Sequence, residues 1–308
     1  MILCGHEIAY GQKKEIEIPV INSNPIKASI FCGEKEGKTL VITAGVHGCE
    51  YVGIEAAQRL KNIINPKELC GNIILVPIVN ESGFFSGAKQ VVPEDNQNLN
   101  RVFPADENGT LSKLIAHAVQ TYLYPYADFL IDLHSGDINE ELFPLVFFPV
   151  AGEQRVNEKA LEAAKCLSVP YRVKSTAKNG LYSYAVQQGI PSLLIERGFG
   201  GLWSENEVSA CIEDIFRIMS YLNIIDKSYD NINQTEISIA VYEETECNGF
   251  WYTNKKAGEE IKQGDLLGVF QTANDKRCIF AQFDGVVLYY TTALGVQKGD
   301  ALIAYGRA

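Results

Sequence analysis

The chain has 308 residues, 46% of them hydrophobic, which allows one large globular domain or a large domain with a small one. Acidic residues outnumber basic ones and leave a formal net charge of -11, which argues against a surface that binds nucleic acid or an anionic membrane. The sequence shows neither a signal-peptide pattern nor an apolar run long enough to span a bilayer, so we expect a cytoplasmic protein.

Most of the chain predicts an alternation of strands and helices. Up to residue 36, polar and apolar residues alternate, which predicts edge or hairpin strands. Apolar runs then predict buried strands at 39–44, 72–79, 129–133 and 192–195. Helical periodicity predicts helices at 50–64, 111–124, 157–167, 181–188 and 205–222. These elements predict an α/β fold with a mostly parallel or mixed sheet that helices cover on both faces.

From about residue 233 the helical periodicity ends and an internal repeat follows. Residues 261–267 match residues 296–302, and both segments place a Gly-Asp pair between short β-rich runs. Such turns predict a small all-β sandwich of two similar halves. We place the boundary in the polar segment 226–235 and expect domains at residues 1–232 and 233–308.

Three residues near predicted strand ends have the chemistry of a metal site. His47 and Glu50 lie just beyond the strand 39–44, and His134 follows the strand 129–133. In open α/β sheets, sites form beyond the carboxyl ends of strands. Two imidazoles and a carboxylate are the ligands of a catalytic zinc site that keeps one position open for water. Taken singly, Glu50 can also be an acid at a helix N-terminus, and His134 can be a hydrogen-bonded core histidine.

Two further acids stand on the predicted strands. Asp132 lies two residues before His134 and therefore shares its face of the strand. Glu196 ends the buried strand 192–195, and a zinc hydrolase needs a base there to pass a proton from water to the leaving amine. The alternative for Glu196 is an ion pair with a neighbouring base. Arg197 points to the opposite side of the strand, so we expect it to be structural.

Two other segments allow both a functional and a plainer interpretation. Arginine binds a carboxylate with two parallel hydrogen bonds, and an amide can add a third. Asn100 and Arg101 are therefore candidates to bind a carboxylate; the alternative is an ordinary surface loop.

The eight cysteines form no C-x-x-C pair, so the sequence indicates neither a zinc knuckle nor a redox pair. Cys49 is either a packed side chain, which we favour, or a reactive thiol.

The order of these motifs resembles the succinylglutamate desuccinylase/aspartoacylase family of the zinc carboxypeptidase-like superfamily. The resemblance covers most of the chain, and the C-terminal β segment resembles the lipoyl-like sandwich domain appended in this family. It rests on His47-x-x-Glu50, Asn100-Arg101, Asp132-Leu133-His134 and Glu196, in that order.

The resemblance implies a zinc carboxypeptidase-like fold and a role for each motif. His47, Glu50 and His134 would hold one Zn2+ per chain, and Glu196 would act as general base and then as general acid. Asn100 and Arg101 would hold the free carboxylate of the substrate. The lipoyl-like resemblance also raises Lys276 as an attachment site for a prosthetic group, but a charged hairpin tip is sufficient for this residue.

Two positions depart from the family pattern. Lys89 stands where relatives usually have an arginine that stabilises the oxyanion, and lysine supplies charge without a fork of donors. Asn98 stands where relatives commonly have an aspartate that pairs with the first histidine ligand, and a neutral amide polarises that imidazole less.

The sequence therefore predicts a zinc-dependent hydrolase that cleaves an amide next to a free carboxylate, most simply by deacylating an N-acyl amino acid. The first alternative is a zinc carboxypeptidase that acts on a small peptide. The second is a non-catalytic carboxylate-binding protein on the same fold, which the changes at Lys89 and Asn98 favour and the presence of Glu196 opposes. The expected partner is a small molecule with a free carboxylate, and the sequence does not indicate the oligomeric state.

Overall fold

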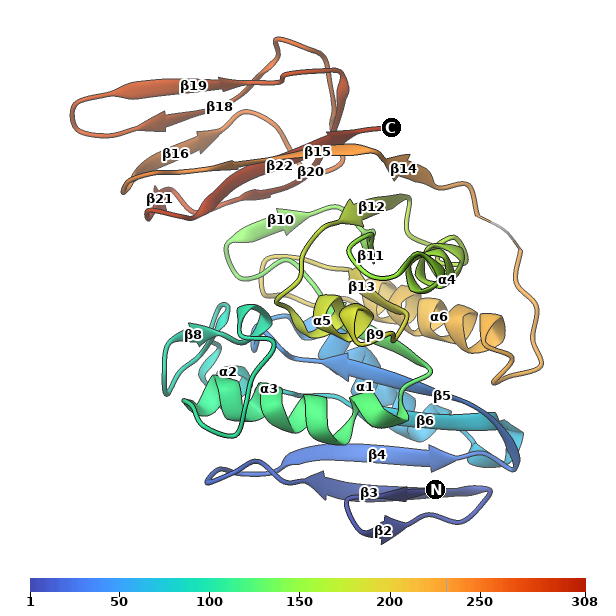
Figure 1. The fold of residues 1–308 in the computed structure, drawn as a ribbon. Coiled ribbons are helices and arrows are strands. Elements are labelled where there is room, and N and C mark those ends of the chain that lie inside the picture. The colour runs from blue at the N-terminus through green and yellow to red at the C-terminus, as the bar shows by residue number, and fades with distance from the viewer. Residues whose placement is uncertain (231) are drawn as a thin grey trace.

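The main body of the protein is a nine-stranded sheet between two layers of helices, in a computed structural model that describes residues 1–230 and 232–308 (Figure 1). The strands of this sheet are β3 (Gln12–Ile18), β4 (Ile26–Cys32), β5 (Lys35–Ala44), β6 (Cys70–Val76), β9 (Phe129–His134), β11 (Leu145–Pro149), β12 (Tyr171–Ser175), β13 (Ser192–Glu196) and β14 (Thr235–Ile237). Their order across the sheet is β14-β12-β11-β13-β9-β5-β6-β4-β3.

The predicted α/β class with a mixed sheet is confirmed. The central strands β13, β9, β5 and β6 are parallel, as their continuous apolar runs predicted. The sheet becomes antiparallel where β4 pairs with β6 and β3, and again where β11 pairs with β13. Strands β11 and β12 were not predicted. The predicted strand 72–79 ends earlier, at Val76, because Pro77 follows and lacks the N–H that a sheet needs.

The helices cover the sheet on both faces, as predicted. They are α1 (Tyr51–Ile63), α2 (Glu81–Ser86), α3 (Leu111–Tyr122), α4 (Gln154–Ala164), α5 (Leu181–Gln187) and α6 (Glu205–Tyr221). The apolar sides of α1, α4 and α6 pack in one core, and those of α3 and α5 pack in the other. Within β9, Ile131 and Leu133 belong to the first core and Leu130 to the second, so alternate side chains serve the two layers.

The C-terminal strands form two small sheets that lie beyond one end of the large sheet (Figure 1). Their order is β10-β20-β22-β15, with β17 beside β20, in one sheet and β19-β18-β16-β21 in the other. The strands are β10 (Glu140–Leu142), β15 (Ile239–Glu244), β16 (Gly249–Thr253), β17 (Glu260–Ile261), β18 (Leu266–Gln271), β19 (Lys276–Phe280), β20 (Gly285–Thr291), β21 (Gly295–Val296) and β22 (Ala301–Arg307). Two short pairs complete the described strands: β1 (Ile2–Leu3) with β2 (His6–Glu7), and β7 (Val91–Val92) with β8 (Gln97–Asn98).

The internal repeat corresponds to two equivalent turns, before β18 and before β22. Gly264 and Gly299 both have a φ of 89°, in the left-handed region that favours glycine. The following aspartate closes each turn, because Asp265 accepts the N–H of Lys262 at 3.2 Å and Asp300 accepts that of Gln297 at 2.8 Å. The similar sequences have therefore produced similar turns in the two halves.

The two parts of the molecule exchange strands. Strand β10 leaves the large domain to pair with β20, and β14 adds to the edge of the large sheet directly before β15. The predicted boundary segment 226–235 contains residue 231, which lies outside the described residues, so the division at 232/233 remains a prediction. None of the helices in the described residues is long and apolar enough to cross a membrane.

Candidate active site

Three neighbouring parallel strands, β13, β9 and β5, end at the same edge of the large sheet. His134 and Glu196 are the last residues of β9 and β13 and occupy paired positions. His47 follows β5 after a turn at Gly45, whose φ of 64° is left-handed. The register of the sheet therefore brings together side chains that are far apart in the chain.

His47, Glu50 and His134 form one compact, buried cluster. His47 Nδ1 lies 2.6 Å from Glu50 Oε1, and His134 Nδ1 lies 2.7 Å from Glu50 Oε2. The two imidazole rings are 4.9 Å apart between centroids and are nearly perpendicular, at 78°. One donor atom from each of the three residues lies within 4.8 Å of the others. This is the set of residues that the sequence singled out as ligands.

The loop that carries His47 and Glu50 is held by close backbone packing. A Cβ on Gly48 would lie 2.1 Å from the carbonyl carbon of Gly83 in α2, so only glycine fits there. Glu50 immediately precedes α1, where a negative charge is favourable near the unpaired N–H groups of the helix. The Ser135 N–H donates to Glu50 Oε2 at 3.3 Å and ties this loop to the end of β9.

The outer nitrogen of each imidazole has its own partner. His47 Nε2 lies 3.1 Å from Asn98 Oδ1, and His134 Nε2 lies 3.0 Å from Asp132 Oδ2. Asp132 is held in turn by the Thr43 hydroxyl, which donates to its Oδ1 at 2.8 Å. Partners of this kind orient metal-binding histidines and leave the inner nitrogens for the metal. Asn98 and Asp132 thus lie where the sequence analysis expected them.

The charges in the cluster also fit a metal ion. Burial raises the pKa of Glu50, but His47 and His134 outweigh it and lower this pKa to about 2. Burial lowers the pKa of His134, whereas Glu50 and Asp132 raise it well above its usual range. An ion would replace these imidazole protons and balance the buried carboxylate. The three residues can therefore hold a divalent metal.

Glu196 lines the same cavity as the cluster. Its Oε2 is buried and makes no hydrogen bond within residues 1–230 and 232–308. Burial raises the pKa of Glu196 to about 8; the nearby His134 opposes this shift, and the acids Glu50 and Asp132 add to it. A carboxyl group that binds and releases a proton near neutral pH suits general acid–base chemistry.

Asn100 and Arg101 lie on a short 3-10 helix at residues Leu99–Arg101 and also line the cavity. Asn100 is buried, and its Oδ1 accepts the N–H of Leu181 at 2.9 Å, which leaves its amide donors for another partner. Arg101 is exposed and makes no ion pair with the described residues. Its guanidinium is therefore available to a carboxylate in the cavity.

Lys89 is not among the residues that line the cavity. Its Nζ lies 3.6 Å from Asp137 Oδ2, and its side chain is 37% exposed. An action on an oxyanion remains a prediction for this residue. Cys49 is fully buried and donates to the Lys89 carbonyl at 3.2 Å, and burial raises the pKa of its thiol to about 12. Cys49 is therefore the packed side chain that we favoured.

The cavity has a volume of about 440 Å³, and strands of the C-terminal sheet contribute to its wall. Sequence reasoning missed several of its lining residues: Gln90, Asp137, Glu140, Tyr182, Tyr242, Glu244 and Tyr289. Asp137 and Glu140 stand close after His134, and this proximity was the one signal available. The tyrosines of β15 and β20 reach the cavity through strand pairing that the local sequence does not predict.

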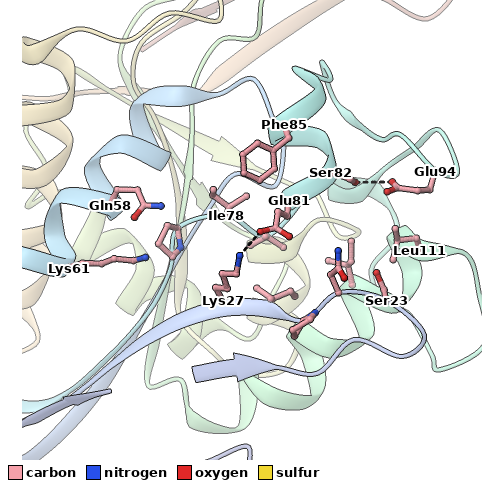
Figure 2. A pocket seen from close by; sticks show the side chains of 16 residues that line it. Ser23, Lys27, Gln58, Lys61, Ile78, Glu81, Ser82, Phe85, Glu94 and Leu111 are labelled. Carbon is pink, nitrogen blue, oxygen red and sulfur yellow. Dashed lines mark hydrogen bonds and ion pairs between the residues drawn. The ribbon is translucent and has the colours of Figure 1, made fainter. Parts of the chain in front are cut away.

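A second cavity, of about 220 Å³, lies between β4, α1 and α2 (Figure 2). Four of its polar side chains form two pairs: Lys27 Nζ lies 2.9 Å from Glu81 Oε1, and the Ser82 hydroxyl donates to Glu94 Oε2 at 2.8 Å. None of the described residues that line it is a histidine. Of these two cavities, the first is the one lined by the His47-Glu50-His134 cluster.

A mixed α/β sheet whose parallel strand ends carry a buried His-Glu-His cluster and an adjacent acid has its candidate site where open α/β folds commonly place one. Residues 36–222 match the family model of the succinylglutamate desuccinylase/aspartoacylase catalytic domain. This match covers more than half of the chain, so the chain belongs to that family of amide hydrolases, and the resemblance noted in the sequence is confirmed.

Individual relatives agree with this assignment. The N-alpha-acetyl-L-2,4-diaminobutyric acid deacetylase of Halomonas elongata is 28% identical over 240 residues, which cover 75% of this chain and 70% of the relative. The product-bound ectoine utilization protein EutE (DoeB) of Ruegeria pomeroyi has the same fold, with a TM-score of 0.84, 22% identity and coverage of 96% and 94% of the two chains. A succinylglutamate desuccinylase/aspartoacylase of Rhodobacter sphaeroides gives a TM-score of 0.83 at 24% identity, with 96% of this chain and 94% of that chain covered.

Proposed function

We propose that the protein is a zinc-dependent hydrolase that removes the acyl group from an N-acyl amino acid. The observation that carries this proposal is the arrangement of a buried His47-Glu50-His134 cluster and an unpartnered Glu196 in one small cavity. Two imidazoles and one carboxylate are the protein ligands of catalytic zinc sites. The deacetylase activity named for the Halomonas elongata relative supports the choice of an acylated amino acid as substrate.

The substrate enters with its carboxylate toward Asn100 and Arg101. The Arg101 guanidinium pairs with that carboxylate, and the Asn100 amide donates to it, because its oxygen is already occupied by Leu181. This contact sets the direction of the substrate, so that its amide lies toward the cluster. The cavity of about 440 Å³ suits a small molecule such as an N-acyl amino acid.

Glu196 moves the protons of the reaction. As a carboxylate it takes a proton from the attacking water, and as a carboxylic acid it gives that proton to the leaving nitrogen, so the products are a free amine and the acid of the acyl group. His47, Glu50 and His134 would hold the zinc ion, which would supply a Lewis acid for the amide carbonyl and for water. Asn98 and Asp132 keep the two imidazoles in their orientation.

The two alternatives fit these observations less well. A carboxypeptidase needs room for a peptide, whereas Tyr242 and Tyr289 of the C-terminal sheet form part of the wall of this cavity. A carboxylate-binding protein has no use for Glu196, and a buried carboxyl oxygen without a partner is costly to keep. Such a cost is typical of a group retained for catalysis.

The test measures metal and activity together. We expect the wild-type protein to contain about one equivalent of zinc by elemental analysis, and His134→Ala to lose it because one of the three ligands is gone. Deacylation of N-acetyl amino acids should require this zinc, stop on chelation and return when zinc is restored. A protein that hydrolyses them equally well without metal would disprove the proposal.

A further inference from the structure

The second cavity, between β4, α1 and α2, combines apolar and polar side chains in equal number (Figure 2). Eight of its 16 lining residues are apolar, among them Ile78, Val79 and Phe85. Phe85 is 76% exposed, so a ligand with an apolar body would cover part of a large apolar side chain. An apolar cavity of about 150 Å³ holds a molecule of the size of benzene, so the 220 Å³ of this cavity suits a short-chain compound.

The charged side chains that line this cavity leave one ammonium group open. Lys27 is paired with Glu81, and Glu94 accepts from the Ser82 hydroxyl. Lys61 is the other charged residue of the lining, and its ammonium makes no hydrogen bond or ion pair with residues 1–230 or 232–308. An ammonium group has three donors and no acceptor, so a ligand at Lys61 must supply acceptor atoms.

A second open donor lies beside Lys61. Gln58 and Lys61 are three residues apart in α1 and therefore lie on one face of the helix. Both side chains are half-buried and extend from α1 over the cavity, toward Lys27 (Figure 2). The Gln58 amide also has no hydrogen-bond partner among the described side chains drawn there.

Two plainer roles for Lys61 do not explain this direction. A lysine in the last turn of a helix is favourable on its own, but that role is served equally well by a side chain in open solvent. The acid Glu15 of β3 is not a partner either, because it pairs with Lys13 at 2.9 Å and accepts the Ser29 hydroxyl at 2.7 Å. An ammonium beside an amide donor is the arrangement that binds a carboxylate.

The wall of this cavity is also bonded to the loop that carries His47. The Val79 N–H donates to the Ala44 carbonyl at 2.9 Å, and the Asn80 N–H donates to the Gly45 carbonyl at 2.9 Å. Helix α2, whose first residues line the cavity, packs directly against the same loop. A ligand that changes the position of residues 77–82 therefore acts on the position of this loop.

From these observations we infer that the second cavity binds a short-chain aliphatic carboxylate and that its occupancy moves the loop that carries His47. The carboxylate lies at Lys61 and Gln58, and the aliphatic chain lies on Ile78 and Phe85. An acid of this kind is also what the deacylation of an aliphatic N-acyl amino acid releases. Binding to the second cavity requires no turnover, so it can be tested apart from the proposed function.

The experiment titrates butyrate into the isotope-labelled full-length protein and follows its amide signals by NMR. We expect the signals of residues 58–61 and 78–85 to shift with a Kd of about 1 mM, as suits a ligand of this size. The signals of residues 45–48 should shift along the same curve. Butylamine has the same chain but the opposite charge and should shift none of them.

Three outcomes of this titration would overturn the inference. Equal binding of butylamine would exclude the carboxylate as the recognised group. Shifts at residues 58–61 and 78–85 without any at residues 45–48 would exclude the link to the loop. Shifts confined to residues around the first cavity would show that butyrate binds there and not in the second one.

Two variants locate the contact. Gln58→Glu places a carboxylate three residues before Lys61, where it pairs with this ammonium, repels butyrate and supports α1, so the Kd should rise at least about 10-fold. Lys61→Met removes the charge itself and should have the same effect. The matched control is Lys159→Met, at an exposed position of α4, which should bind butyrate as the wild type does. Wild-type affinity in both cavity variants, or loop shifts that persist in Gln58→Glu, would disprove the assignment.

Discussion

The two walls of the cavity differ in how their side chains are held. On the wall formed by the ends of β5, β9 and β13, both histidines and Asp132 are buried and hydrogen-bonded. On the opposite wall, Tyr242 is 44% exposed, and Tyr289 comes from a strand that pairs with the large domain only through β10. A rigid wall suits a reaction whose geometry must be exact to fractions of an ångström, and a looser wall suits the choice of substrate. Mutations should therefore reduce turnover on the first wall and change affinity or preference on the second.

Glu196→Gln should give the largest effect of the substitutions that preserve the metal. Glutamine keeps the size of the side chain but cannot accept and return a proton, so kcat should fall about 100- to 10,000-fold. Zinc content should remain that of the wild type, because Glu196 is not one of the three clustered ligands. Steady-state rates and elemental analysis of the same sample check both points, and activity within tenfold of wild type would remove Glu196 from the mechanism.

Arg101→Ala should act mainly on substrate binding. Loss of the guanidinium leaves the substrate carboxylate without its ionic partner, so KM should rise about 10- to 100-fold with a smaller change in kcat. Arg155→Ala, at an exposed position of α4, is the control and should behave as wild type. An unchanged KM in Arg101→Ala would mean that another group recognises the carboxylate.

Asn98→Asp should strengthen the metal site. An aspartate opposite His47 Nε2 would make this imidazole a better donor, and zinc affinity should rise about 10-fold in competition with a chelator. Gln97→Glu adds the same charge one residue away, where the side chain bonds to Thr110, and should leave the affinity unchanged. Equal affinities in wild type and Asn98→Asp would show that the amide already serves as well as a carboxylate.

Tyr289→Phe should give the smallest effect and is the direct test of the second wall. Burial, with the charge of Glu140, raises the pKa of this phenol and keeps it a hydrogen-bond donor. Its removal should lower kcat/KM about 3- to 10-fold through KM, with kcat retained. The control is Tyr290→Phe, because that phenol donates to Glu141 at 2.7 Å and does not line the cavity. If Tyr289→Phe lowered kcat as much as Glu196→Gln does, the second wall would serve turnover as well, and the proposed difference between the two walls would be wrong.

The sequence predicted the site best where its residues stand at the end of a strand or the start of a helix. His47, Glu50, His134 and Glu196 each stand at the end of an apolar run or the start of a helix, and in parallel sheets such ends meet at one edge. Their grouping could therefore be predicted without knowing any long-range contact. The antiparallel direction of β11 beside β13, by contrast, is set by strand pairing and not by any pattern within β11 itself.

No local pattern placed Tyr289 beside this cluster, and for Glu140 the one signal was its closeness to His134 in the chain. The positions of both residues depend on the pairing of β10 with β20, which joins Glu140 to Thr291 across about half of the chain. The register of that pair depends on packing between residues such as Leu145 and Leu288, which share one apolar cluster, and not on any neighbour in sequence. The residues of the chemical centre could thus be identified from local pattern, whereas the wall that faces them arises from side-chain packing between distant strands.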